Sequence, residues 1–145
     1  ALLPHLPPDP TGVLLYAPLA AGNHVDHQLA AQAALQLAQR GYSLFFYEDY
    51  PYVQRQPSEV ERALHTLHRL SENFAPWRDH AIPLTEADLA TKIRAIAAYT
   101  SQMEVLFGGA EAMARLVTRY ARQVGNGQPA ERLWTLHFSE TDVTQ

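Results

Sequence analysis

The stretch GVLLYAPLAAGNHVDHQLAAQAALQLAQRGYSLFFY, residues 12–47, decides the fold. It opens with a short apolar run that a proline closes, which is typical of a buried strand. The run from Gln28 to Arg40 then predicts a helix that ends at Gly41. Its expected apolar face consists of Leu29, Ala30, Ala33, Ala34, Leu37 and Ala38. The aromatic run of residues 42–47 predicts a second buried strand. Strand, helix and strand in this order predict a βαβ unit of an α/β fold.

Polar residues with catalytic potential lie where the first strand leads into the helix. Two imidazoles and a carboxylate fall within four positions there, at His24, Asp26 and His27. In an open α/β sheet, ligands bind at the loops that leave the carboxyl ends of the strands. The acidic and aromatic residues 48–52 follow the second strand. We therefore expect both loops to border one pocket.

The histidine motif has the chemistry of a divalent metal site, because imidazole nitrogen and carboxylate oxygen are ordinary zinc ligands. We expect His27 in the first helical turn, where the helix dipole keeps the ring neutral and able to bind a cation. We expect Asp26 to be the N-cap, or else to orient a neighbouring imidazole. His24, on the loop, is suited to protonate a leaving amine or to stabilise an oxyanion. The alternative is a helix cap flanked by two solvated histidines.

Composition narrows the class of protein. The 145 residues fit one domain with a core, and the net charge of −4 gives no reason to expect nucleic acid as a partner. Since there is no cysteine, any metal must be held by histidine and carboxylate. We find no apolar run of membrane-spanning length and no signal-peptide pattern. We therefore expect a soluble, cytoplasmic protein.

Outside the βαβ unit, hydrophobic periodicity predicts three further helices and two short extended segments. In chain order these are a helix over residues 58–72, an extended segment over 77–84, a long helix over 85–108, a helix over 110–124 and a strand over 131–138. Ser58 and Glu61 are spaced as a capping box for the first of these helices. His65 and His68 are three residues apart in it and lack a third ligand nearby, so we expect no metal site there.

The histidine motif carries a resemblance to a known family. Pro18-Leu19, Gly22 and His24-Val25-Asp26-His27, followed by an alanine-rich helix, resemble the second signature of the N-acetylglucosaminyl-phosphatidylinositol de-N-acetylase family, the LmbE-like zinc deacetylases. Further similarity lies in residues 45–52, 92–109 and 131–134. The resemblance covers nearly all of the chain and implies a Rossmann-like three-layer α/β/α sandwich.

The resemblance also implies roles for single residues. His27 would be a zinc ligand, with another divalent metal as an alternative. His24 would protonate the leaving amine or stabilise the tetrahedral intermediate, and Asp26 would orient His24. The implied reaction is hydrolysis of an N-acetyl amide on a glucosamine-like sugar or glycoconjugate by zinc-activated water. The residues expected to contact this substrate are Asn23, Glu48, Asp49 and Tyr50.

One family feature is absent from this sequence. The first signature, Ala-His-Pro-Asp-Asp-Glu, supplies the other two zinc ligands and the general base in the family, and a lone histidine cannot hold zinc tightly. The chain also begins at Ala1 without methionine, in a proline-rich segment. We therefore expect residues 1–145 to be a single domain that forms the C-terminal part of a deacetylase domain without its first strands. Such a chain should be inactive alone, and should self-associate or bind the missing segment. The alternative is a non-catalytic glycan-binding or assembly module that retains part of the fold.

Overall fold

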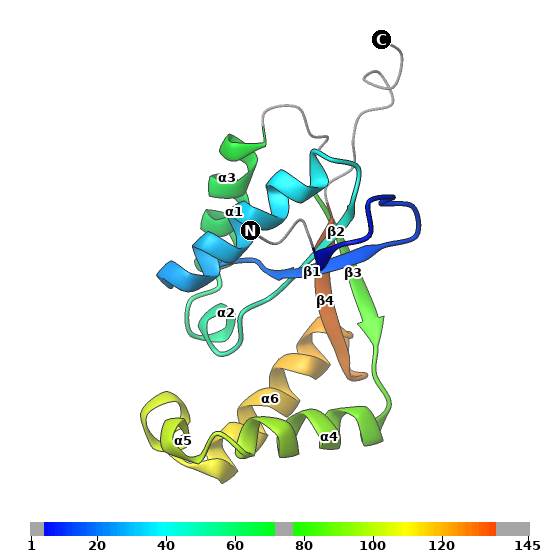
Figure 1. Cartoon of the computed structure of the whole chain (residues 1–145). Helices are drawn as coiled ribbons and strands as arrows, with labels where there is room; N and C mark the ends of the chain where they lie inside the picture. The colour runs from blue at the N-terminus through cyan, green and yellow to red at the C-terminus, as the bar shows by residue number, and fades with distance from the viewer. Residues whose placement is uncertain (1–4, 72–76, 136–145) are drawn as a thin grey trace. The chain divides into compact units, whose positions relative to one another are not determined.

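The computed structural model describes residues 5–71 and 77–135, which contain a four-stranded sheet and helices (Figure 1). The elements in chain order are β1 (Leu14–Pro18), α1 (Val25–Ala38), β2 (Ser43–Tyr47), α2 (Tyr52–Arg55), α3 (Ser58–Leu70), β3 (Arg78–Pro83), α4 (Glu86–Ala97), α5 (Thr100–Phe107), α6 (Ala110–Val124) and β4 (Ala130–Thr135). The strand order is β1-β2-β4-β3, with β1 parallel to β2 and β2 antiparallel to β4. The predicted α/β fold and its parallel βαβ unit are confirmed. Residues 136–138 of the predicted last strand lie outside the described residues.

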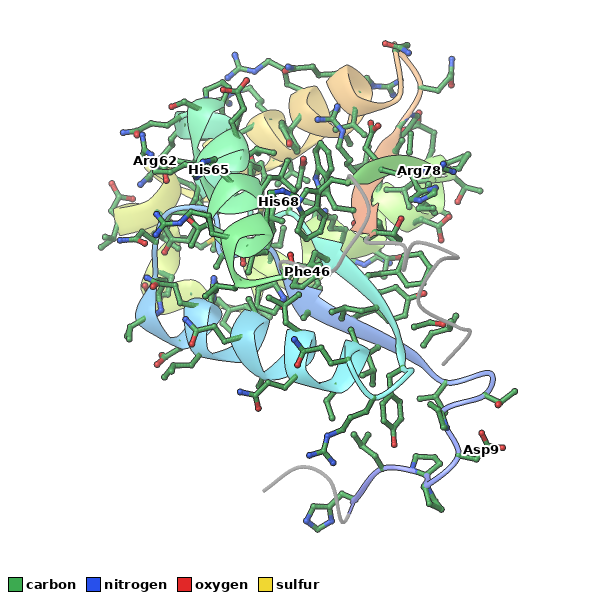
Figure 2. All side chains as sticks on the ribbon, turned by 90° about the horizontal axis from the view of Figure 1, so that it is seen from above. Asp9, Phe46, Arg62, His65, His68 and Arg78 are labelled. Carbon is green, nitrogen blue, oxygen red and sulfur yellow. The ribbon has the colours of Figure 1, made fainter. Side chains whose placement is uncertain are left out.

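The chain divides into two compact units, and the histidine motif belongs to the first. This unit comprises residues 1–79 and 133–145, whereas residues 80–132 form the second. In the first unit the core lies on the face of β1 and β2 that α1 and α3 cover, where Phe46 is fully buried (Figure 2). The other buried members of this cluster are Ala17, Leu19, Ala31, Ala34, Leu35, Ala38, Leu44, Ala63 and Leu67.

The buried face of α1 differs from the predicted one. Leu29 and Ala30, which were expected to be buried, are exposed. Ala31 and Leu35 are buried instead, next to the correctly predicted Ala34, Leu37 and Ala38. Five of the fourteen residues of α1 are alanines. Because alanine is small and only weakly hydrophobic, the hydrophobic pattern fixes the rotation about the helix axis poorly.

The start of α3 also differs from the prediction. The helix begins at Ser58 as expected, but its N-cap is Pro57 and no side chain caps it. The predicted capping box of Ser58 and Glu61 is therefore wrong. Pro57 already has helical backbone angles, φ −54° and ψ −30°, which places Ser58 inside the first turn rather than before it. The short helix α2, which begins at the last residue of the predicted loop 48–52, was not foreseen.

The second unit contains two helices where the sequence predicts one long helix. The predicted start is confirmed, because Thr85 and Asp88 form a reciprocal capping box at the beginning of α4. The helix ends at Ala97, however, and α5 begins at Thr100. Tyr99 lies between them with φ −83° and ψ 59°, outside the helical region. Thr100 and Ser101 follow as the first residues of α5, and no side chain caps that helix. The predicted bounds of α6 are confirmed.

Candidate active site

The loop between β1 and α1, which we call the motif loop, has an unusual backbone. Ala20, Gly22 and Asn23 all have positive φ angles, of 65°, 82° and 61°. A Cβ atom on Gly22 would lie 2.4 Å from the ring of Tyr52, so this position requires glycine. The Gln28 side-chain amide donates to the backbone carbonyl and to Oδ1 of Asn23, at 2.8 and 2.9 Å. These contacts hold the loop in one shape just before the histidine motif.

His24 is the N-cap of α1, a position that the sequence assigned to Asp26. The His24 Nδ1 atom accepts a hydrogen bond from the backbone N–H of Asp26 at 3.3 Å. Asp26 therefore lies within the first turn, and its carboxylate is 3.8 Å from the same Nδ1 atom. Since Nδ1 accepts a backbone N–H, we assign the proton of the neutral ring to Nε2. His24 can then donate a hydrogen bond from Nε2.

His27 lies in the first turn of α1, as predicted, and faces a buried carboxylate. Its Nδ1 atom is 2.7 Å from Oδ1 of Asp49, whose side chain is 1% exposed. An N–H bond on Nδ1, in the plane of the ring, does not point well at this oxygen. Two lone pairs facing each other at this distance would repel, however, so a proton must lie between the atoms. The other Asp49 oxygen, Oδ2, accepts the backbone N–H of Ala21 at 2.9 Å. Burial raises the pKa of the Asp49 carboxyl, against the opposing effects of His27 and of backbone N–H groups.

The two imidazoles of the motif lie side by side. The ring centroids of His24 and His27 are 5.1 Å apart, and the ring planes are tilted by 42°. The rings of Tyr52 and His27 are nearly perpendicular, at 78°, with 6.5 Å between their centroids. The side chains of His24 and His27 are 47% and 36% exposed, respectively, so a ligand can reach both.

The predicted substrate-binding residues occupy different environments. Glu48 accepts a hydrogen bond from the indole N–H of Trp134 at 3.0 Å, and Tyr50, which is half-buried, donates one to Gln54. Asp49 was expected to meet substrate hydroxyls, but the structure places its carboxylate beneath His27. Sequence alone did not reveal this contact. The predicted parallel pairing of β1 and β2 could have indicated it, because parallel pairing brings the carboxyl ends of the two strands, and the residues that follow them, close together.

A groove between α1 and α3 borders the motif loop. Its wall includes Asn23, Gln28 and Arg62, but neither imidazole lines it. His65 and His68 follow Arg62 along α3 (Figure 2), and both are exposed.

The described residues do not form a complete metal site. Across residues 5–71 and 77–135, no three His, Asp or Glu side chains are grouped so that they could hold an ion. His27 fits the role of one ligand, but this donor set alone does not fit zinc, which takes at least three protein ligands. Within the same residues, no helix is long and apolar enough to cross a membrane.

Comparison with known proteins identifies relatives of the fold. No protein-family model matches the chain, and neither does any curated protein. Among solved structures, the A40926 pseudoaglycone deacetylase Dbv21 matches with a TM-score of 0.70 and 23% identity, over 88% of this chain and 50% of that one. The zinc-inhibited form of teicoplanin deacetylase Orf2 matches with a TM-score of 0.66 and 22% identity, over 88% of this chain and 46% of that one. The chain thus has the α/β fold of these deacetylases and spans about half of their length.

Proposed function

We propose that this chain supplies part of the active site of a metal-dependent deacetylase of the LmbE-like kind. The reaction would be hydrolysis of an N-acetyl amide on a glucosamine-like sugar or glycoconjugate. The observation that carries the proposal is the adjacent pair of His24 and His27, 5.1 Å apart at the carboxyl end of a parallel strand. Its fold, shared with the teicoplanin and A40926 pseudoaglycone deacetylases, supports the same class of reaction.

The proposed roles follow from the protonation of the two rings. His27 would bind zinc, or another divalent ion, through Nε2, because its Nδ1 faces Asp49. A bound zinc ion would supply a Lewis acid and an activated water. His24 would donate a proton or a hydrogen bond from Nε2 to the leaving amine or to the oxyanion. The Asp26 carboxylate, 3.8 Å from His24 Nδ1, would orient that ring.

Substrate contacts are proposed for the loop residues around the two rings. Glu48 and Tyr50 follow the carboxyl end of β2, next to the carboxyl end of β1 where the motif loop begins. Asn23 borders the groove between α1 and α3. Carboxylate, phenol and amide groups suit the hydroxyls of a sugar. We propose that these three residues contact the sugar.

We also propose that the chain is the C-terminal part of the deacetylase domain. It spans about half of each solved deacetylase, and the residues that the structure describes offer one ligand of the expected set. Strand β1 lies at the edge of the sheet, and its Leu14 and Tyr16 are 53% and 58% exposed. Parallel strands are normally covered on both faces. The remaining ligands and the missing cover would come from residues outside this chain.

The second candidate function is a non-catalytic glycan-binding or assembly module. It is favoured by the lack of a three-ligand group among the described residues. Zinc content and deacetylation of a panel of N-acetyl sugars discriminate the two. Both should be measured on the 145-residue chain and on the longest encoded protein that contains it. We expect zinc and turnover in the longer protein and neither in the chain alone. A longer protein without zinc or turnover would support the module.

Single substitutions in the longer protein test the assigned roles. We expect His27→Ala to abolish zinc retention and activity together. His24→Ala should keep zinc and slow turnover by roughly 10²- to 10⁴-fold, the usual contribution of a general acid. The control is His68→Ala on the exposed side of α3, which should change neither zinc content nor rate. Full activity of His24→Ala would contradict the role given to that ring.

A further inference from the structure

Asp49 is a buried carboxylate whose two oxygens face two different segments. Oδ2 accepts the N–H of Ala21 in the motif loop, and Oδ1 lies 2.7 Å from Nδ1 of His27 in α1. The side chain is 1% exposed, so water does not solvate it. A carboxylate is expensive to bury unless its oxygens are matched by hydrogen-bond donors. When Asp49 is ionised, both of its oxygens therefore require donors, and the group that lies against Oδ1 is the His27 ring.

This requirement fixes which nitrogen of His27 carries the proton. An imidazole that donates from Nδ1 keeps an unprotonated Nε2, whose lone pair is free for a cation. A carboxylate partner also makes that nitrogen more basic and restricts rotation of the ring. Asp49 thereby ties His27 and the motif loop to the end of β2.

The neighbouring ring is held in the opposite way. Nδ1 of His24 accepts the backbone N–H of Asp26 at 3.3 Å, so the proton of the neutral ring is on Nε2. Two imidazoles 5.1 Å apart thus present different groups at the same ring position. His27 offers a lone pair and His24 offers an N–H.

We propose that Asp49 is a positioning residue. Together with the helix cap at His24, it gives the two imidazoles opposite tautomers. Nε2 of His27 can then bind a divalent cation, and Nε2–H of His24 can donate to an electron-rich oxygen or nitrogen of the ligand. The cation part of this inference rests on the proposed function. The tautomer part concerns the chain itself and can be tested without metal or substrate.

The first test is the tautomer of each ring in the ¹⁵N-labelled 145-residue chain. Long-range ¹H–¹⁵N correlation spectra should be recorded at about pH 8, above the ordinary histidine pKa of about 6.5. Signals are assigned with His24→Gln and His27→Gln. We expect His27 to carry its proton on Nδ1 and His24 on Nε2. The same tautomer in both rings, or a proton on Nε2 of His27, would overturn the proposal.

The second test removes one acceptor from position 49 and preserves its size. Asp49→Asn has one oxygen and one NH₂ group, so it can accept from Ala21 while it donates to His27. We expect His27 to switch to the tautomer with its proton on Nε2. The matched control is Asp26→Asn, the same change at an exposed carboxylate, which should leave His27 unaltered. An unchanged His27 tautomer in folded Asp49→Asn would refute the role of Asp49. Should that variant fail to fold, the wild-type spectra still decide.

A third measurement connects the tautomer to the metal in the longer protein. Loss of a partner of this kind lowers metal affinity by about 10- to 100-fold. We expect Asp49→Asn to weaken zinc binding by that factor and to regain turnover at saturating zinc, as a positioning role requires. Undiminished zinc affinity would count against the proposal. If the longer protein binds no zinc at all, the proposed function fails, whereas the tautomers of the chain still test the role of Asp49.

Discussion

The two faces of the β1–β2 pair are similar in hydrophobicity and differ sharply in burial. On one face Ala17, Leu44 and Phe46 are 5%, 6% and 0% exposed and pack beneath α1 and α3. On the other face, which we call the open face, Leu14, Tyr16 and Tyr47 are 53%, 58% and 42% exposed. Phe45 belongs to the open face as well, and its ring stacks on that of Tyr16 with 5.4 Å between centroids.

This difference shows that the strands encode more apolar surface than the described residues bury. Parallel strands that are apolar on both sides are typical of sheets with helices on both faces. The helices α1 and α3 account for one face. Exposed apolar surface of this kind marks a site of association, and the open face therefore supports the proposal that further residues complete the domain.

The largest expected effect concerns the two adjacent phenylalanines of β2. Phe46→Ala should lower the free energy of unfolding by about 3–5 kcal/mol, because it leaves a cavity in a packed core. Phe45→Ala, the same change one residue away, should lower it by no more than about 1.5 kcal/mol, since its ring is not enclosed. Urea unfolding followed by circular dichroism measures both. Equal losses would show that the two faces do not differ as described.

An intermediate effect is expected on self-association. The open face and the edge of β1 should let the isolated chain self-associate. Tyr16→Lys should weaken this association by at least about tenfold, or ~1.4 kcal/mol, because a charged group must then be desolvated. Tyr99→Lys is the control, as Tyr99 is 69% exposed in the second unit. Sedimentation velocity over a range of concentrations measures the constants. A monodisperse wild-type monomer would contradict the expectation.

The smallest expected effect is the titration of Tyr47. Burial, and to a lesser degree the negative charge of Asp49, raises the pKa of the Tyr47 phenol above its ordinary value of 10.0. The folded state therefore holds this proton more tightly than the unfolded state. The resulting stabilisation is complete below pH 10.0 and is lost as the pH rises through the raised pKa.

Urea midpoints of the wild type and of Tyr47→Phe between about pH 9 and about pH 11 isolate this contribution, because that range brackets the tyrosine pKa. We expect the midpoint of the wild type to fall more steeply. Covering the open face in the longer protein should raise the pKa of Tyr47 further. Parallel midpoint curves would show that the phenol is not perturbed.

The elements with the strongest patterns were predictable from the sequence. The apolar runs ended by Pro18 and Tyr47 defined the parallel strands, and the spacing of Met113 and Val117 defined α6. Alanine-rich α1 was placed correctly but rotated wrongly, because alanine carries little directional information. The interruption at Tyr99 was missed, since apolar periodicity continues across it.

Within the candidate site, the sequence revealed which residues cluster but not how they pair. The positions of His24 and His27 followed from the strand and helix that flank them. The cap at His24 was missed because histidine is an unusual N-cap residue. The contact of Asp49 with His27 joins a residue of the loop after β2 to a residue of α1, and no local pattern encodes its geometry.

The fit of Tyr52 against Gly22 has a consequence for protein engineering. The Tyr52 ring occupies the space that a side chain at Gly22 would need, and it also lies at 78° to the His27 ring with 6.5 Å between the centroids. A library that randomises residues 50–52 to alter specificity would therefore lose this packing against the motif loop whenever it varies position 52. Diversity introduced at Tyr50 with Tyr52 held constant should leave the arrangement of His24 and His27 intact and, under the proposed function, change the ligands accepted.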